Sequence, residues 1–233
     1  MQATKSRLAR LGVWWRQLLG HGLFAYSRLV MLTGRYRVEG WEHMHAAQES
    51  GRPILWSLWH GQMMPFVVFA DRFLERANFV AVIVGDERGD TLGAYGSHFG
   101  STPYRVDMGG NPVAAGRAVL RVIEGLQGGR MSMLAPDGPD GPPYVPKPGV
   151  TFLARKAEAV ILPIGLWSRQ AIRLPRWDHY QVPVPLGRIH ITIGEPIYAE
   201  RKSDDAALQE TLSAALHKRR TRAQVMTGIK PWR

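Results

Sequence analysis

The chain has 233 residues, of which 45% are hydrophobic, so it is long enough for a domain with a buried core and too apolar for wholesale disorder. It contains no cysteine, which excludes disulfides, cysteine-bound zinc, iron–sulfur clusters and a thiol nucleophile. The net charge of +11 comes from the two ends, because residues 1–38 and 211–233 hold thirteen of the 30 Lys and Arg residues and none of the 19 acids.

These cationic ends flank a body whose net charge is −2. Basic ends suit an anionic membrane surface, whereas a nucleic-acid enzyme more often spreads positive charge along its binding groove. We therefore expect a membrane partner and no nucleic acid. A solubilising bias or a disordered basic tail is the plainer interpretation of the same charges.

The first predicted element is an amphipathic helix within residues 1–38. Apolar residues recur there at intervals of three, four and seven, with one gap, at Leu8, Leu11, Trp15, Leu18, Tyr26 and Leu29. We expect a break near Gly20 and Gly22. Arg16 and Arg28 leave eleven residues between them, fewer than the ~20 that a membrane span needs, and no cleavage site marks a signal peptide. The helix therefore lies on a lipid surface or packs, for part of its length, on the core of the domain.

The body alternates strand-like with helix-like segments, which predicts an α/β domain with a mostly parallel or mixed central sheet flanked by helices. The predicted strands cover residues 54–58, 79–84, 103–106, 131–135, 160–166 and 188–193. The predicted helices cover residues 61–76, 90–99, 112–127, 149–157 and 203–225. We expect residues 79–84 to form a central strand, residues 188–193 to form a half-buried strand at an edge, and Ser203 to cap the last helix.

Three unusual clusters follow predicted strands. His60 follows the first strand, residues 85–90 follow the second, and residues 136–148 follow the fourth. In open α/β sheets, ligands bind beyond the carboxyl ends of the strands. The sequence therefore predicts one site to which all three clusters contribute.

His60 lies in the segment Trp59-His60-Gly61-Gln62, where a strand meets a helix. Histidine side chains titrate near neutral pH, which suits them to removing a proton from a hydroxyl. A histidine at such a place is more often structural, so position alone is weak evidence for a catalytic base.

The most unusual stretch is residues 135–143, which contain two Asp-Gly-Pro triplets in a row. Proline fixes φ and glycine permits a positive φ, so the loop has a specified shape. We expect it to present Asp137, Asp140 and its backbone amides to a substrate, with Lys147 adding one cation. Long irregular loops in compact domains are usually functional, although a plain turn-rich connection is the alternative.

Charged residues near two further strands complete the predicted site. Asp86, Arg88 and Asp90 follow the second strand, and Arg105 lies in the short third one. An arginine can hold a phosphate or carboxylate with its fork of donors, although surface arginines are far commoner. The chain lacks the Gly-x-Ser-x-Gly, Walker and Gly-x-Gly-x-x-Gly motifs, and its eight histidines show no metal-ligand spacing.

Together these motifs resemble the bacterial DUF374 family of the lysophospholipid acyltransferase superfamily, over about residues 35–200. The most specific match is the Pro-Asp-Gly-Pro loop with the Lys-Pro-Gly segment after it. The matching pieces, in chain order, are Trp59-His60-Gly61, residues 85–90, Arg105, Pro136-Asp137-Gly138-Pro139-x-Gly141-Pro142, Lys147-Pro148-Gly149-Val150, Pro163-Ile164-Gly165, Trp177-Asp178 and residues 182–186.

The resemblance implies a glycerol-3-phosphate acyltransferase-like fold and a His–Asp dyad whose histidine is His60. The superfamily's aspartate follows five positions later, where this chain has Pro65. Another carboxylate must then orient His60, and Asp90 is the first candidate, with Asp86 the second. The residues that the resemblance and the motifs assign to substrate binding are Arg88, Arg105, Asp137, Gly138, Pro139, Gly141 and Lys147.

The resemblance also implies the reaction. An acyl group passes from acyl-CoA or acyl carrier protein, without a further cofactor or metal, to a hydroxyl of a lysophospholipid-like or other lipid acceptor. His60 takes the proton of that hydroxyl, and backbone amides near residues 137–141 stabilise the oxyanion. An acyl hydrolase on the same fold remains an alternative. So does a lipid- or nucleic-acid-binding protein without catalysis, which the missing aspartate at Pro65 favours.

This interpretation divides the chain into three parts. We expect a membrane-associating helical segment over residues 1–38, an acyltransferase-like α/β domain over residues 39–200, and a C-terminal helix with a basic tail over residues 201–233. The expected location is the cytoplasmic face of the cell membrane, as a peripheral or monotopic protein.

Overall fold

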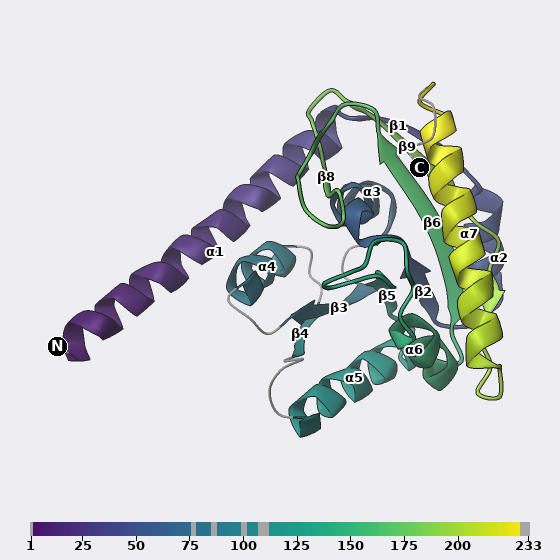
Figure 1. Cartoon of the computed structure of the whole chain (residues 1–233), viewed down its shortest axis with the longest axis horizontal. Coiled ribbons are helices and arrows are strands. Elements are labelled where there is room, and N and C mark those ends of the chain that lie inside the picture. The colour runs from purple at the N-terminus through teal and green to yellow at the C-terminus, as the bar shows by residue number, and fades with distance from the viewer. Residues whose placement is uncertain (1, 76–77, 85–87, 99–101, 107–111, 229–233) are drawn as a thin grey trace.

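The computed structural model describes residues 2–75, 78–84, 88–98, 102–106 and 112–228. In this part of the chain an eight-stranded sheet has the order β1-β9-β6-β2-β5-β3-β4, with β10 paired to β6 beside this path (Figure 1). Its strands are β1 (Arg35–Glu39), β2 (Ile54–Ser57), β3 (Phe79–Val84), β4 (Thr102–Val106), β5 (Met131–Leu134), β6 (Val160–Ser168), β9 (Arg188–Ile193) and β10 (Ile197–Tyr198). Strands β2 to β6 are parallel to one another, while β9 and β10 run antiparallel to β6. The predicted α/β sheet is confirmed.

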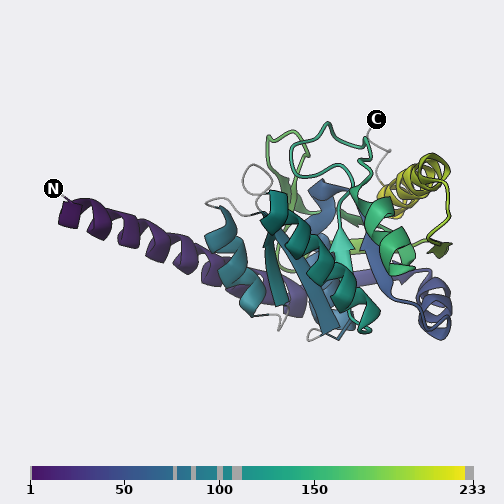
Figure 2. The same ribbon diagram turned by 90° about the horizontal axis from the view of Figure 1, so that it is seen from below.

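Helices cover both faces of the sheet (Figure 1, Figure 2). One face carries α1 (Gln2–Thr33), α2 (Trp41–Glu49) and α3 (Met63–Phe73), and the other carries α5 (Pro112–Gln127), α6 (Gly149–Ala157) and α7 (Asp205–Val225). Successive strand residues point to opposite faces. Trp56 and Leu162 therefore pack with the first group of helices, whereas Leu55 and Ile161 pack with the second.

Two strands lie elsewhere in the sheet than the sequence predicts. β9 is buried at five of its six residues and lies between β6 and β1, so it is neither half-buried nor at an edge. β1 pairs along it, and α7 covers it, where the Thr192 hydroxyl donates to the Arg219 carbonyl at 2.8 Å. β3 lies next to the edge strand β4 and not at the centre, which β2 occupies. The pattern along a strand does not show which elements will cover it.

The helix α1 is continuous over its 32 residues, so the predicted break at Gly20 and Gly22 is wrong. Gly20 serves the packing of α4 (Arg88–Ser97), because a Cβ there would lie 2.5 Å from the carbonyl oxygen of Thr91. The end of α1 reaches the core, where Val30 and Met31 are buried, while its first half projects from the body (Figure 1, Figure 2). Packing on the core is thus confirmed for part of the helix. Among the described residues, no helix is both long and apolar enough to cross a membrane.

The helix α7 begins one residue later than the predicted cap implies. Asp204 is the cap, since its Oδ1 accepts from Ala207 N at 2.8 Å, while Ser203 Oγ accepts from Glu200 N at 2.9 Å. The helix then passes so close to β6 that a Cβ on Gly165 would lie 2.2 Å from the α7 backbone. This close approach buries Arg220, so part of the basic C-terminal end lies inside the protein.

Candidate active site

His60 lies where β2 ends, in the middle of the parallel part of the sheet. It opens a single turn of 3-10 helix over residues 60–62, directly before α3. Its neighbour Trp59 is fully buried, whereas the His60 side chain keeps 19% of its surface exposed. The end of a buried strand therefore holds the imidazole in place while leaving one edge of it open.

The carboxylate of Asp178 holds the imidazole. His60 Nδ1 lies 2.6 Å from Asp178 Oδ2, and the Asp178 side chain is fully buried. This contact assigns the Nδ1 proton to the side of Asp178, so Nε2 is the nitrogen left to accept a proton. Among the described residues, no hydrogen bond to Nε2 competes with a substrate.

The charge on Asp178 is stabilised by its neighbours. Burial by itself raises the pKa of the Asp178 carboxyl, but the hydrogen bond from His60 and the charge of Arg176 outweigh it, so the pKa lies below its ordinary value. Arg176 contacts both carboxylate oxygens: its Nε lies 3.4 Å from Asp178 Oδ1, and its Nη2 donates to Oδ2 at 3.4 Å. A carboxylate that stays ionised in this way can stabilise an imidazolium opposite it.

Gly61 explains how two segments far apart in the sequence come together. Asp178 lies between the strands β7 (Ala171–Arg173) and β8 (Gln181–Pro183), which form a separate two-stranded sheet. A Cβ at Gly61 would lie 2.1 Å from the Asp178 carbonyl oxygen, so only glycine lets this segment approach. The rings of Trp177 and Tyr180 then flank His60, with centroids 5.2 and 6.2 Å from its own.

Asp137 does not face a substrate, contrary to the prediction. It is 1% exposed, its Oδ1 accepts from the backbone N–H of His60 at 2.9 Å, and its Oδ2 accepts from the backbone N–H of Tyr144 at 3.2 Å. Burial raises the pKa of the Asp137 carboxyl, against the lowering effect of these hydrogen bonds. Asp137 therefore fastens the loop after β5 to the turn that carries His60, because β5 and β2 are neighbours in the sheet.

The rest of this loop encloses the same histidine. A Cβ at Gly138 would lie 2.8 Å from His60 Cδ2, and Lys147 Nζ donates to the Gly138 carbonyl at 3.2 Å. Gly141 has a φ of 75°, and a Cβ there would meet the Trp177 ring at 2.7 Å. The prediction of a tightly specified loop beside His60 thus agrees with its geometry.

The backbone amides of the loop are largely engaged. Gly138 N donates to the Ala135 carbonyl at 3.2 Å, Gly141 N donates to the Asp137 carbonyl at 3.1 Å, and Pro139 has no N–H. Of residues 138–141, this leaves the amide of Asp140 as the donor available for an oxyanion. Since the amide of Asp137 interacts with its own carboxylate, the amides predicted near residues 137–141 are narrowed to that of Asp140.

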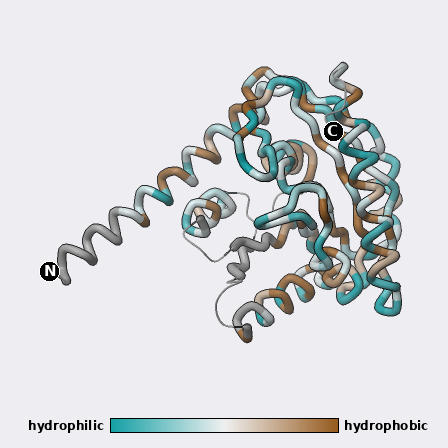
Figure 3. Tube along the Cα trace, viewed as in Figure 1, coloured by the Kyte–Doolittle hydropathy of each residue, from teal (hydrophilic) through white to brown (hydrophobic). Residues whose placement is uncertain are grey.

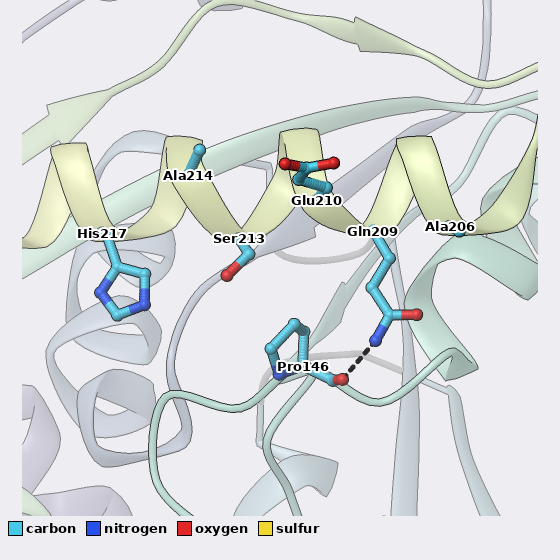
Figure 4. A pocket seen from close by; sticks show the side chains of 7 residues that line it. All are labelled: Pro146, Ala206, Gln209, Glu210, Ser213, Ala214 and His217. Atoms are coloured by element: carbon cyan, nitrogen blue, oxygen red, sulfur yellow. Dashed lines mark hydrogen bonds between the residues drawn. The ribbon is translucent and has the colours of Figure 1, made fainter.

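The helix α7 braces the loop from outside. Gln209 Nε2 donates to the carbonyl of Pro146, immediately before Lys147 (Figure 4). A shallow groove separates the helix from Pro146, and His217 lies along it (Figure 4). The ring of His217 also contacts Trp59 at a centroid distance of 5.1 Å. Loop, helix and the residue before His60 therefore support one another.

The second predicted cluster lies elsewhere. Asp90 sits on α4, where its Oδ2 accepts from Arg16 Nε of α1 at 3.1 Å, so Asp178 and not Asp90 takes the position against His60. Arg88 begins α4, and Arg105 lies in β4, three strands from β2 or about 14 Å across the sheet. Asp86 lies outside the described residues.

Sequence reasoning missed the role of Asp178. Its separation of 118 residues from His60 hides the pairing from any local pattern. Two signals point toward it: the absent carboxylate at Pro65, and the pair Trp177-Asp178 among the motifs that resemble the family. Those motifs place the residue in the site without stating its task.

The fold has a counterpart among solved structures. No family model matches the chain. The chain is 27% identical over 178 residues to an uncharacterised protein, RP090, of Rickettsia prowazekii (strain Madrid E). This alignment covers 75% of the chain and 78% of RP090. The chain is also similar to the crystal structure of the 1-acyl-sn-glycerophosphate (LPA) acyltransferase PlsC from Thermotoga maritima. That match has a TM-score of 0.57 and 16% identity, and covers 94% of this chain and 83% of the other. The likeness shows a common fold.

Proposed function

We propose that this chain transfers a fatty acyl group from a thioester to a hydroxyl of a lipid acceptor, with His60 as the general base. The contact of 2.6 Å between His60 Nδ1 and Asp178 Oδ2 carries the proposal, since it leaves Nε2 at a partly exposed position. The pair lies beyond the carboxyl end of β2, where α/β sheets bind ligands, on a fold shared with an acyltransferase. It also supplies the carboxylate that Pro65 does not, and so weakens the case for a protein without catalysis.

In the proposed reaction, His60 Nε2 takes the proton of the acceptor hydroxyl while the oxygen attacks the thioester carbonyl. The tetrahedral intermediate then breaks its C–S bond, and the leaving thiolate takes the proton back from the imidazolium. An ester and a free thiol result, and the enzyme carries no acyl group at any stage. Asp178 stays ionised and stabilises the imidazolium, while the amide of Asp140 donates to the oxyanion.

Cations on the loop, on α4 and on β4 are proposed to hold an anionic head group. Lys147 Nζ donates one of its three N–H groups to the Gly138 carbonyl, which ties the ammonium to the loop and leaves two donors. Arg88 and Arg105 are proposed as further contacts, as the family resemblance implies. The acyl donor is proposed to be acyl-CoA or acyl carrier protein.

The projecting half of α1 is proposed to dock on an anionic membrane at its cytoplasmic face. Trp14 and Trp15 are more than half exposed there, as is Leu19 one turn further on. Hydrophobic and hydrophilic residues are mixed along the part of the helix that Figure 3 colours. Tryptophan favours the lipid–water boundary, and basic residues add attraction to anionic lipids.

The test is an acyl-transfer assay of the full-length protein with labelled acyl-CoA or acyl carrier protein. The acceptors are 1-acyl-glycerol 3-phosphate and other lysolipids, chosen by comparing the lipids of cells with and without the gene. We expect His60→Ala and Asp178→Asn each to lower kcat about 10²- to 10⁴-fold, while His45→Ala on the exposed face of α2 leaves it unchanged.

Each other outcome has a definite meaning. Full transfer by His60→Ala would remove the general base from the proposal. Thiol release without a lipid product identifies a hydrolase, and lipid binding without thiol release identifies a binding protein.

A further inference from the structure

A small chamber lies beside Asp178, on the interior side of the site. Its walls come from the turn after β2, the loop after β5, the segment from β6 to β8, and α7. The wall residues that matter are Trp59, Gln62, Trp167, Arg173, Asp178 and Arg220. The space between them has room for about one water molecule.

Each of these six residues carries a buried polar atom without a hydrogen-bond partner among the described residues. Five are N–H donors: Trp59 Nε1, Trp167 Nε1, Gln62 Nε2, Arg173 Nε and Arg220 Nε. The sixth is the carboxylate oxygen Oδ1 of Asp178, which makes no hydrogen bond but lies 3.4 Å from Arg176 Nε in an ion pair. One such group typically costs about 1–3 kcal/mol when left unpaired, and native proteins leave few of them. The gathering of six residues with such atoms around one space favours a polar molecule within it.

Arg220 is the most unusual of the six. Its side chain is 6% exposed, and no carboxylate pairs with it in the part of the chain that the structure describes. Its guanidinium lies 4.1 Å from the centroid of the Tyr144 ring, which covers one face of the group. Gly165 permits this burial, because any side chain there would hold α7 away from β6. The fold thus brings a cation to the chamber without giving it a direct partner.

We infer that the chamber binds one water molecule, which accepts from Arg220 Nε and donates to Asp178 Oδ1. Water suits both ends of this contact, because it is a donor and an acceptor and needs two to four polar partners. A halide of similar size would accept from the N–H groups, but the charge of Asp178 would repel it. The water therefore links the pair of His60 and Asp178 to Arg220, a second cation besides Arg176.

Through this water, Arg220 is a positioning residue. It holds the Asp178 carboxylate in the rotamer that meets His60 Nδ1, and its charge offsets part of the charge of Asp178. The consequence for catalysis rests on the proposed role of His60, whereas the water site itself does not.

The first experiment is a crystal structure of the full-length protein at atomic resolution, from crystals grown with and without bromide. We expect one ordered water within hydrogen-bond distance of both Asp178 Oδ1 and Arg220 Nε, and no anomalous signal there. An empty chamber overturns the inference. An anomalous bromide peak in the chamber also overturns it, in favour of an anion site.

The second experiment is an NMR titration of the full-length protein labelled at the histidine ring carbons, with the His60 signal assigned from His60→Gln. Arg220→Met removes the cation, so the midpoint measured for this variant is expected to lie at higher pH than that of the wild type, because the charge of Asp178 is then less compensated. Arg219→Met is the matched control, because it removes one positive charge at the preceding position of α7. Its effect on the His60 titration is expected to be smaller.

Equal shifts in these two variants overturn the coupling, since they indicate a general effect of charge. If Arg220→Met does not fold, Arg220→Lys keeps the charge but moves the donor, and its shift is again expected to exceed that of the control. Neither experiment uses an acyl substrate, so a failure of the proposed acyl transfer would leave both tests valid.

Discussion

Two buried aspartates do different work around His60. Asp178 accepts a hydrogen bond from the imidazole, whereas Asp137 binds only backbone N–H groups and joins the loop after β5 to the turn after β2. The nearby Asp140 belongs to the same tandem motif and is exposed. The two aspartates of the tandem motif therefore differ in position: Asp137 is buried and structural, whereas Asp140 faces solvent.

Asp137→Asn is expected to destabilise the protein by about 1–3 kcal/mol. Asparagine has one acceptor oxygen in place of two, so a backbone N–H of His60 or Tyr144 loses its partner in a buried place. Urea unfolding measures the difference in the free energy of unfolding. Asp140→Asn is the matched control and should change it little; equal losses in both variants would contradict the structural role of Asp137.

The lowered pKa of Asp178 implies that the free energy of unfolding depends on pH in the acid range. Because the pKa of its carboxyl is lowered in the folded state, the stability that it contributes is fully present above the ordinary value of 3.8 and is lost as the pH falls through the folded value. Urea unfolding of the wild type and of Asp178→Asn between pH 3 and 6 should therefore show a difference that shrinks at the acid end. A constant difference would show that the charge of Asp178 contributes nothing.

At the scale of elements, α1 and α4 form one packed pair. Gly20 brings their backbones together, the Ser27 and Tyr95 hydroxyls are 2.8 Å apart, and Arg16 pairs with Asp90. Burial raises the pKa of the Tyr95 phenol above its ordinary value, which agrees with its position between the helices. The projecting helix is therefore fixed to the body along its second half.

Gly20→Ala is expected to weaken this pair of helices. The new Cβ would lie 2.5 Å from the Thr91 carbonyl, so the helices must separate, at a typical cost of about 1–3 kcal/mol. Gly22→Ala is the matched control, since open space surrounds that position and alanine favours a helix by up to about 1 kcal/mol. Thermal unfolding should place the two variants on opposite sides of the wild type.

At the scale of the whole molecule, the two basic ends have different surroundings. In the C-terminal end, Arg220 is buried and Arg222 pairs with Glu39 at 2.8 Å, so these charges already serve the fold. In the N-terminal end, the projecting half of α1 leaves Trp14 and Trp15 exposed. The N-terminal end is therefore the one to test for membrane binding.

Flotation with vesicles tests this surface. We expect binding to vesicles rich in phosphatidylglycerol, and the double variant Trp14→Ser, Trp15→Ser should weaken it at least about tenfold, since each ring contributes at the lipid boundary. Leu120→Ser changes an equally exposed apolar residue on α5 and is the control. Unchanged binding of the double variant would contradict docking through α1. Deletion of the whole helix is unsuitable, because Val30 and Met31 belong to the core.

The amino-acid sequence is enough to predict the α/β class, most of the strands and helices, and the position of His60 beside the Pro-Gly loop. These features follow from local signals. Hydrophobic periodicity marks each strand and helix, proline and glycine restrict the loop, and a parallel sheet gathers the ends of its strands at one edge.

The tertiary structure decided which partner each polar group has. Asp178 reaches His60 across 118 residues, Asp137 turns inward, and Asp90 joins Arg16 instead of the site. It also decided that β9 is an interior strand and that Gly20 packs a helix and does not break one. Each of these outcomes depends on a neighbour distant in the sequence, whose approach is determined by the packing of the whole fold and not by the residues beside it.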